Sequence, residues 1–125
     1  QGHLARAVLE GIAFQNVDIL QAMEKDLGRS LTSLNVDGGA AANNLLMQFQ
    51  SDVLGVTLKR PKYLETTSLG AIFAAGLGIG IWNSLTDIER TWVEDRSFSP
   101  AMAPKVRDEH LIRWRSAVSR VNLKA

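Results

Sequence analysis

Apolar residues recur at helical spacing in several stretches of the chain. The first stretch predicts a helix over about residues 3 to 27, ended by Gly28. Its apolar positions repeat at intervals of four or seven residues and form one stripe: Leu4, Val8, Ile12, Ile19 and Met23. The second stretch predicts a helix over residues 41 to 54, ended by Gly55. Its stripe consists of Ala42, Leu45, Leu46, Phe49 and Val53.

Short strand-like runs lie on either side of the second predicted helix. Residues 34 to 37 end at a double glycine, and residues 56 to 60 are stopped by Pro61. Two strands joined by a helix predict a right-handed parallel βαβ unit. Parallel sheets normally have several strands and are covered on both faces, so we expect the chain to supply one edge of a larger sheet. Gln1 is not a start methionine, which also favours a piece of a longer protein.

The remaining pattern predicts two further helices and one less regular region. Thr66 or Thr67 can cap a third helix, whose small residues (Gly70, Ala71, Ala74, Ala75 and Gly76) favour burial against a close neighbouring backbone. Thr86 and Glu89 have capping-box spacing for a short helical turn, and residues 91 to 98 are strand-like without a clean period. A final helix is indicated by Leu111, Trp114, Val118 and Val121.

Composition narrows the classes of function. The 125 residues are 46% hydrophobic and 22% charged, which is typical of one globular domain. Fourteen basic and thirteen acidic residues nearly cancel, so net charge favours neither nucleic acid nor an anionic membrane as a partner. The longest apolar run, residues 69 to 82, is shorter than the roughly 20 residues of a membrane span. The absence of cysteine excludes thiolate metal sites and fits a cytoplasmic protein, and His3 and His110 have no metal-ligand spacing.

The turn Asp37-Gly38-Gly39 is the candidate site. Ligands of open parallel sheets bind beyond the carboxyl ends of the strands, and this turn lies between such an end and a helix start. Glycine lets a backbone adopt positive φ and lets a ligand lie close, and Asn43 could hydrogen-bond a base or ribose. The same residues also fit a tight turn without a ligand. Pattern alone leaves the two interpretations about even, because the spacing is not a full dinucleotide or P-loop motif.

Several segments, in order, resemble the C-terminal part of glycerol kinases, in the FGGY family of carbohydrate kinases. They are LEGIAFQ (9–15), LNVDGGAAANNLLMQFQSDVLGV (34–56), RP (60–61), ETTSLGAIFAAGLGIGIW (65–82) and the closing residues Trp114, Ala117, Val118 and Arg120. This resemblance implies an α/β fold: the C-terminal portion of an actin-like, ribonuclease-H-like ATPase domain, with two parallel strands and packed helices. It implies that residues 1–82 are part of the nucleotide-binding domain and that residues 83–125 are an extension whose terminal helix packs on the same domain.

The resemblance also implies a function for the turn. Gly39 corresponds to a glycine that packs against the nucleotide, Asn43 to an asparagine that contacts adenosine, and Gly38 shapes the turn. Asp37 is expected to anchor the turn, for instance by accepting backbone N–H bonds, and the catalytic aspartate is expected in the upstream part of the enzyme. The parent would transfer the γ-phosphoryl group of ATP, with Mg²⁺, to glycerol and release ADP, as a cytoplasmic homo-oligomer, while the isolated fragment would be inactive.

Two alternatives to a glycerol kinase remain. The same fragment could belong to a kinase for another polyol or sugar, since the acceptor pocket is not in this chain. It could also belong to a non-catalytic actin-like module that binds nucleotide, in which the glycine turn is kept without transfer chemistry.

Overall fold

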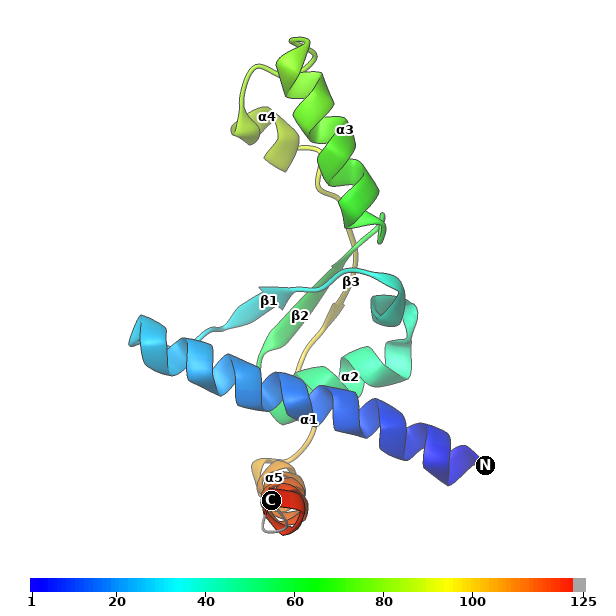
Figure 1. Cartoon of the computed structure of the whole chain (residues 1–125), viewed down its shortest axis with the longest axis vertical. Helices are drawn as coiled ribbons and strands as arrows, with labels where there is room; N and C mark the ends of the chain where they lie inside the picture. Colours follow the sequence, from blue (N-terminus) through cyan, green and yellow to red (C-terminus); the bar gives the residue numbers. More distant parts are fainter. Residues whose placement is uncertain (123–125) are drawn as a thin grey trace.

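A mixed sheet with helices packed beside it forms the centre of the molecule (Figure 1). The structure, a computed structural model, describes residues 1–122. In chain order its elements are α1 (Gly2–Leu27), β1 (Ser33–Asn35), the 3₁₀ helix η1 (Gly39–Ala42), α2 (Asn44–Leu54), β2 (Thr57–Pro61), α3 (Thr66–Gly78), α4 (Leu85–Glu89), β3 (Glu94–Phe98) and α5 (Pro104–Asn122).

The sheet has the order β1-β2-β3. β1 pairs parallel with β2, with Leu34 opposite Leu58, and α2 connects the two strands. This confirms the predicted parallel βαβ unit. The irregular strand-like region supplies a third strand, because β3 pairs antiparallel with β2 and places Phe98 opposite Leu58. β2 is therefore the central strand, and β1 forms one edge of the sheet within the described part of the chain.

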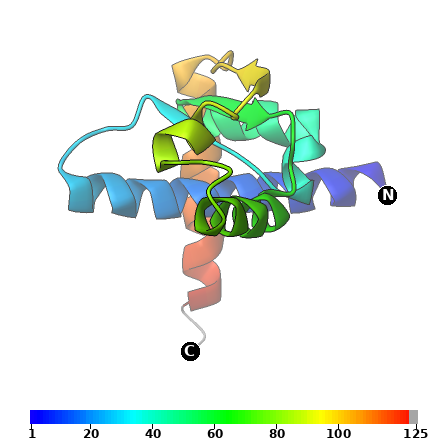
Figure 2. The ribbon, with the colours of Figure 1, turned by 90° about the horizontal axis from the view of Figure 1, so that it is seen from above.

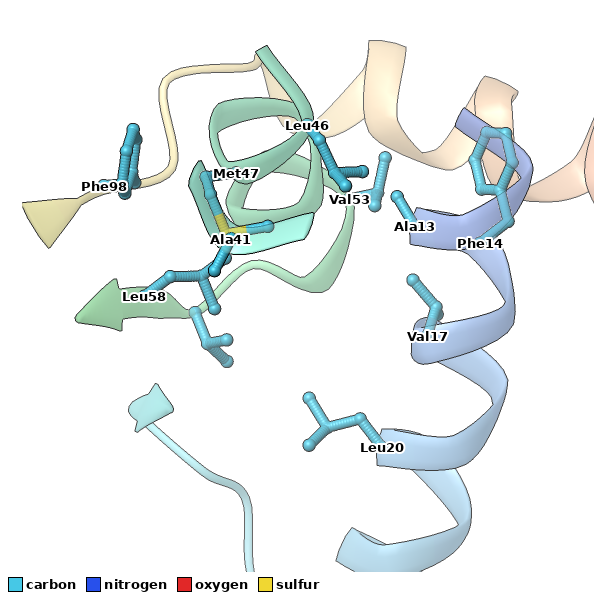
Figure 3. Packing of buried hydrophobic residues seen from close by; sticks show 11 residues of the cluster. Ala13, Phe14, Val17, Leu20, Ala41, Leu46, Met47, Val53, Leu58 and Phe98 are labelled. Carbon is cyan, nitrogen blue, oxygen red and sulfur yellow. The ribbon is translucent and has the colours of Figure 1, made fainter. Parts of the chain in front are cut away.

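The hydrophobic core lies between the sheet and the paired helices α1 and α2 (Figure 3). Leu58 of the central strand is fully buried and lies near Met47 of α2, whereas Leu46 and Val53 of α2 lie beside Ala13 of α1. Ser51 adds a buried polar link, because its hydroxyl lies 2.8 Å from the Val56 carbonyl and 2.9 Å from the Phe98 carbonyl. This one side chain thus connects α2 to the residue before β2 and to the last residue of β3.

The buried face of α1 differs from the predicted stripe. The helix has the predicted extent, and Gly28 ends it with a left-handed φ of 65°. Its buried residues are Ala13, Phe14, Val17 and Leu20, whereas all five residues of the predicted stripe are exposed. α1 has two neighbouring apolar faces, and the face with small Ala13 is the one that approaches α2.

The last helix, α5, crosses α1 (Figures 1 and 2) and packs Leu111 and Trp114 against the edge of the core. The Trp114 ring stacks on Phe14 at a centroid distance of 5.4 Å, and its Nε1 donates to Asp18 at 2.9 Å. His110 lies edge-on to Phe49 at a centroid distance of 5.6 Å, so this histidine takes part in packing. Of the predicted stripe on α5, Val121 alone is exposed.

α3 and α4 extend away from the rest of the molecule, beyond the carboxyl end of β2 (Figure 1). The prediction of a buried third helix is wrong for this chain, since Gly76 is its one buried residue. A Cβ on Gly76 would collide with the Trp82 ring. The close neighbour of this glycine is therefore a side chain from the segment between α3 and α4, and not a neighbouring backbone as predicted. The cap of α4 is Ser84, which accepts a hydrogen bond from the Asp87 backbone N–H, and not the predicted Thr86 and Glu89 pair.

None of the helices within residues 1–122 combines the length and the apolar character that a membrane crossing requires.

The exposed apolar stripe of α1 predicts self-association of the isolated chain. Replacing Ile12 and Ile19 by glutamate should shift the chain toward the monomer, because both side chains are exposed and an apolar stripe in water favours burial against another copy. Sedimentation velocity at tens of micromolar would measure this. His3→Glu with Lys25→Gln is the matched control, since it changes the net charge equally outside the stripe. A wild-type chain that stays monomeric would contradict the prediction.

Candidate functional site

The glycine turn begins where β1 ends and is tied to the neighbouring connection. Gly38 has φ 80° and ψ 171°, a backbone conformation that residues with a Cβ rarely adopt. Its N–H donates to the Leu64 carbonyl at 3.0 Å, and its own carbonyl accepts from the Ala41 N–H at 3.0 Å. Gly38 therefore redirects the chain from the strand into η1 while it remains hydrogen-bonded to the segment before α3.

Gly39 begins η1 and leaves its backbone open. The residue is exposed, and a Cβ added to Gly38 or Gly39 would meet no atom within 4 Å. Packing inside this chain therefore does not require glycine at position 39. An open backbone at the carboxyl edge of a parallel sheet gives a flat ligand a surface to lie against.

Asn43 is the N-cap of α2. Its Oδ1 accepts hydrogen bonds from the backbone N–H groups of Leu45, at 3.0 Å, and of Leu46, at 3.1 Å. The second helix therefore begins at Asn44 and not at residue 41 as predicted, because η1 takes up the preceding residues. Since capping uses Oδ1, a ligand contact from this side chain would come from its amide nitrogen.

Asp37 is held by a side chain rather than by the backbone N–H groups expected from the sequence. The Thr66 hydroxyl donates to its carboxylate. Thr66 was expected as a possible cap of α3, but it is the first helical residue, and the capping position is Glu65, whose side chain makes no capping bond. The sequence signal for this pair was weak, because only the meeting of parallel strand ends brings positions 29 apart together.

The glycine turn is a surface and not an enclosed pocket in this chain. A groove of about 740 Å³ lies beside it, between α3, α4 and the end of β2, and its lining includes Tyr63, Phe73, Trp82 and Trp92. Gly38, Gly39 and Asn43 do not contribute to that lining. Within residues 1–122, no three histidine, aspartate or glutamate side chains gather as metal ligands would.

The solved structures with the same fold define the class of protein: the carbohydrate kinases, which have the actin-like ATPase fold. A solved glycerol kinase from Plasmodium falciparum with ADP is 40% identical, with a TM-score of 0.80, over 94% of this chain and 24% of that one. A gluconate kinase from Lactobacillus acidophilus shares the fold at 24% identity, with a TM-score of 0.72 over 92% of this chain and 24% of that one. The model of the C-terminal domain of the FGGY family of carbohydrate kinases matches residues 1–79, and the chain belongs to this family.

Curated relatives give the same family at higher identity. A glycerol kinase from Myxococcus xanthus is 58% identical over 118 residues, which are 94% of this chain and 24% of that protein. One from Bdellovibrio bacteriovorus is 54% identical over 121 residues, which are 97% of this chain and 24% of that protein. The chain therefore spans about a quarter of the length of these relatives.

The capping role of Asn43 can be tested by comparing two substitutions. Asn43→Ala should lower the free energy of unfolding by about 1 kcal/mol, because the N–H groups of Leu45 and Leu46 lose their acceptor. Asn43→Ser keeps an oxygen that can cap and should stay within a few tenths of a kcal/mol of wild type. Urea unfolding of the chain at low concentration measures both. Equal stability of the alanine variant and wild type would show that the cap is dispensable.

Proposed function

We propose that this chain is the part of an ATP-dependent glycerol kinase that holds the adenosine end of the nucleotide. The parent enzyme transfers the γ-phosphoryl group of ATP to glycerol and yields glycerol 3-phosphate and ADP. The observation that carries the proposal is the 58% identity to a glycerol kinase across 94% of the chain. The ADP of the Plasmodium falciparum structure supports a nucleotide ligand for the same fold.

The roles proposed for three residues follow from their positions. Gly39 is the backbone surface against which the nucleotide packs, since it is exposed and its Cβ position is open. Gly38 sets the direction of that surface through its positive φ. Asn43 starts α2 and offers its amide nitrogen to adenosine while Oδ1 caps the helix. Together they form one wall of a cleft, and domain closure in the parent would supply the other and exclude water.

No catalytic residue is assigned to this chain. The Asp37 carboxylate is engaged by the Thr66 hydroxyl, which supports an anchoring role rather than proton abstraction from an acceptor alcohol. Mg²⁺ neutralises phosphate charge in such reactions, and its protein ligands are proposed in the rest of the parent. The acceptor site for glycerol and the catalytic base are likewise proposed in the rest of the parent.

The organisation of the parent is also part of the proposal. Residues 1–82 belong to its nucleotide-binding domain, and residues 83–125 are a C-terminal extension that returns to the same domain. The proposed location is the cytoplasm, and the proposed assembly is a homo-oligomer. The absence of cysteine favours the first, and the family resemblance of the sequence implies the second.

The experiment that tests the function is ADP release by the full-length parent with Mg-ATP. Glycerol should stimulate release strongly and selectively over other polyols and over pentuloses. Stimulation by a different polyol would keep the phosphotransfer mechanism and replace the acceptor. Absence of stimulation by every acceptor would favour a nucleotide-binding module without transfer chemistry.

Replacing Gly39 by valine in the parent should raise the KM for ATP about tenfold or more and leave the KM for glycerol nearly unchanged. The reason is that the valine side chain would enter the open space proposed for the nucleotide. Steady-state kinetics with each substrate varied in turn measure the effect. Gly11→Val is the matched control, because its Cβ position is also open but it lies in α1, far along the chain from the turn. An unchanged KM for ATP would remove Gly39 from the site.

A further inference from the structure

Arg60 lies on the central strand with its charged group enclosed by protein. Its side chain is 11% exposed. Its Nε and Nη2 donate to the same Asp95 carboxylate oxygen of β3, at 2.9 and 2.6 Å, and the guanidinium also lies 5.4 Å from the centre of the Phe98 ring. These contacts fix one edge of the planar group against β3.

The other end of the guanidinium reaches the segment that carries the glycine turn. Nη1 donates to the Ala41 carbonyl at 2.9 Å and to Asn44 Oδ1 at 2.8 Å, with the Ala42 carbonyl at 3.4 Å. Ala41 and Ala42 are the last residues of η1, the short helix that Gly39 begins. Carbonyls at the end of a helical turn lack partners within it and favour a cation nearby.

Apart from its own turn bonds, from the Ala41 N–H to the Gly38 carbonyl and from the Asn43 N–H to the Ala40 carbonyl, η1 has few other restraints. Ala41 is its one buried residue, at 1% exposure, and its neighbours in the turn are exposed. A single buried methyl group fixes the depth of the turn but not its rotation. Hydrogen bonds from Arg60 to the adjacent carbonyls supply that missing restraint, and the bond to Asn44 extends it to the first residue of α2.

We propose that Arg60 is a positioning residue for nucleotide binding, which orients the Gly39 backbone and the Asn43 side chain through η1; this rests on the nucleotide role proposed above for the turn. The Asp37 and Leu64 contacts hold the start of the turn, and Arg60 holds its end. This positioning role requires arginine. The planar guanidinium bonds the Asp95 carboxylate and the η1 carbonyls at the same time, and a lysine ammonium cannot reach both.

The test uses the full-length parent with Arg60→Lys and Arg60→Gln. Both variants should raise the KM for ATP, about tenfold for lysine and more for glutamine, while the KM for glycerol and kcat stay within about twofold. Arg96→Lys is the matched control. Arg96 is the register partner of Arg60 on β3 and lies 5.1 Å from the same Phe98 ring, so it changes an equivalent cation that has no described bond to η1.

A purely structural role would give a different result. If the Arg60 variants lost kcat, affinity for both substrates and melting temperature together, or kept the wild-type KM for ATP, the proposal would be overturned. Calorimetric titration with ADP tests the role of Arg60 separately from the assignment of the parent as a glycerol kinase. A parent that binds ADP but does not phosphorylate glycerol loses the assigned reaction, yet weaker ADP binding by Arg60→Lys still supports the role of Arg60. A parent that binds no ADP overturns both proposals.

Discussion

The parallel pairing of β1 with β2 is the constraint on which the other parts of this structure depend. It aligns Leu34 with Leu58 and brings the carboxyl ends of both strands to one edge of the sheet. The segments that leave these ends are therefore neighbours, although α2 separates them in sequence. The contacts from Gly38 to Leu64 and from Thr66 to Asp37 follow directly from this alignment. A register shift of one residue would turn Leu58 out of the core and separate these pairs.

The sequence pattern was sufficient for elements with strong local signals. Gly28 and Gly55 both adopt the left-handed conformation that ends a helix, and the βαβ unit follows from the apolar spacing on either side of the double glycine. Pattern was insufficient where tertiary contacts choose between local solutions. α1 carries two apolar faces, and only its packing against α2 decides that Phe14 is buried and Ile12 is not. The sequence pattern likewise placed Asn43 inside the second helix, whereas η1 occupies the preceding residues and α2 begins only at Asn44.

In the candidate site, too, local pattern predicted some features and tertiary contacts decided the others. The position of the glycine turn was predictable, because the double glycine follows the first strand-like run and precedes a helical pattern. The side chains that hold the turn were not predictable, since Thr66 and Arg60 reach it from the adjacent strand and its connection. The exposure of α3, which was predicted to be buried, has a separate physical explanation. The chain spans about a quarter of its relatives' length, and under the proposed function the apolar faces of α1 and α3 would pack on other parts of the parent.

Under the proposed function, the Gly39 backbone cannot be fixed by burial, because burial would occupy the space that the nucleotide needs. Gly39 has open space at its Cβ position, so the usual restraint of apolar packing is absent on that side of the turn. Restraint has to come from the opposite side and from both ends. Here it comes from polar groups that accept or donate in fixed directions: the Asp37 carboxylate, the Leu64 carbonyl and the Arg60 guanidinium. Directional bonds suit this purpose better than apolar contacts, since they limit rotation of the turn while its outer surface remains free.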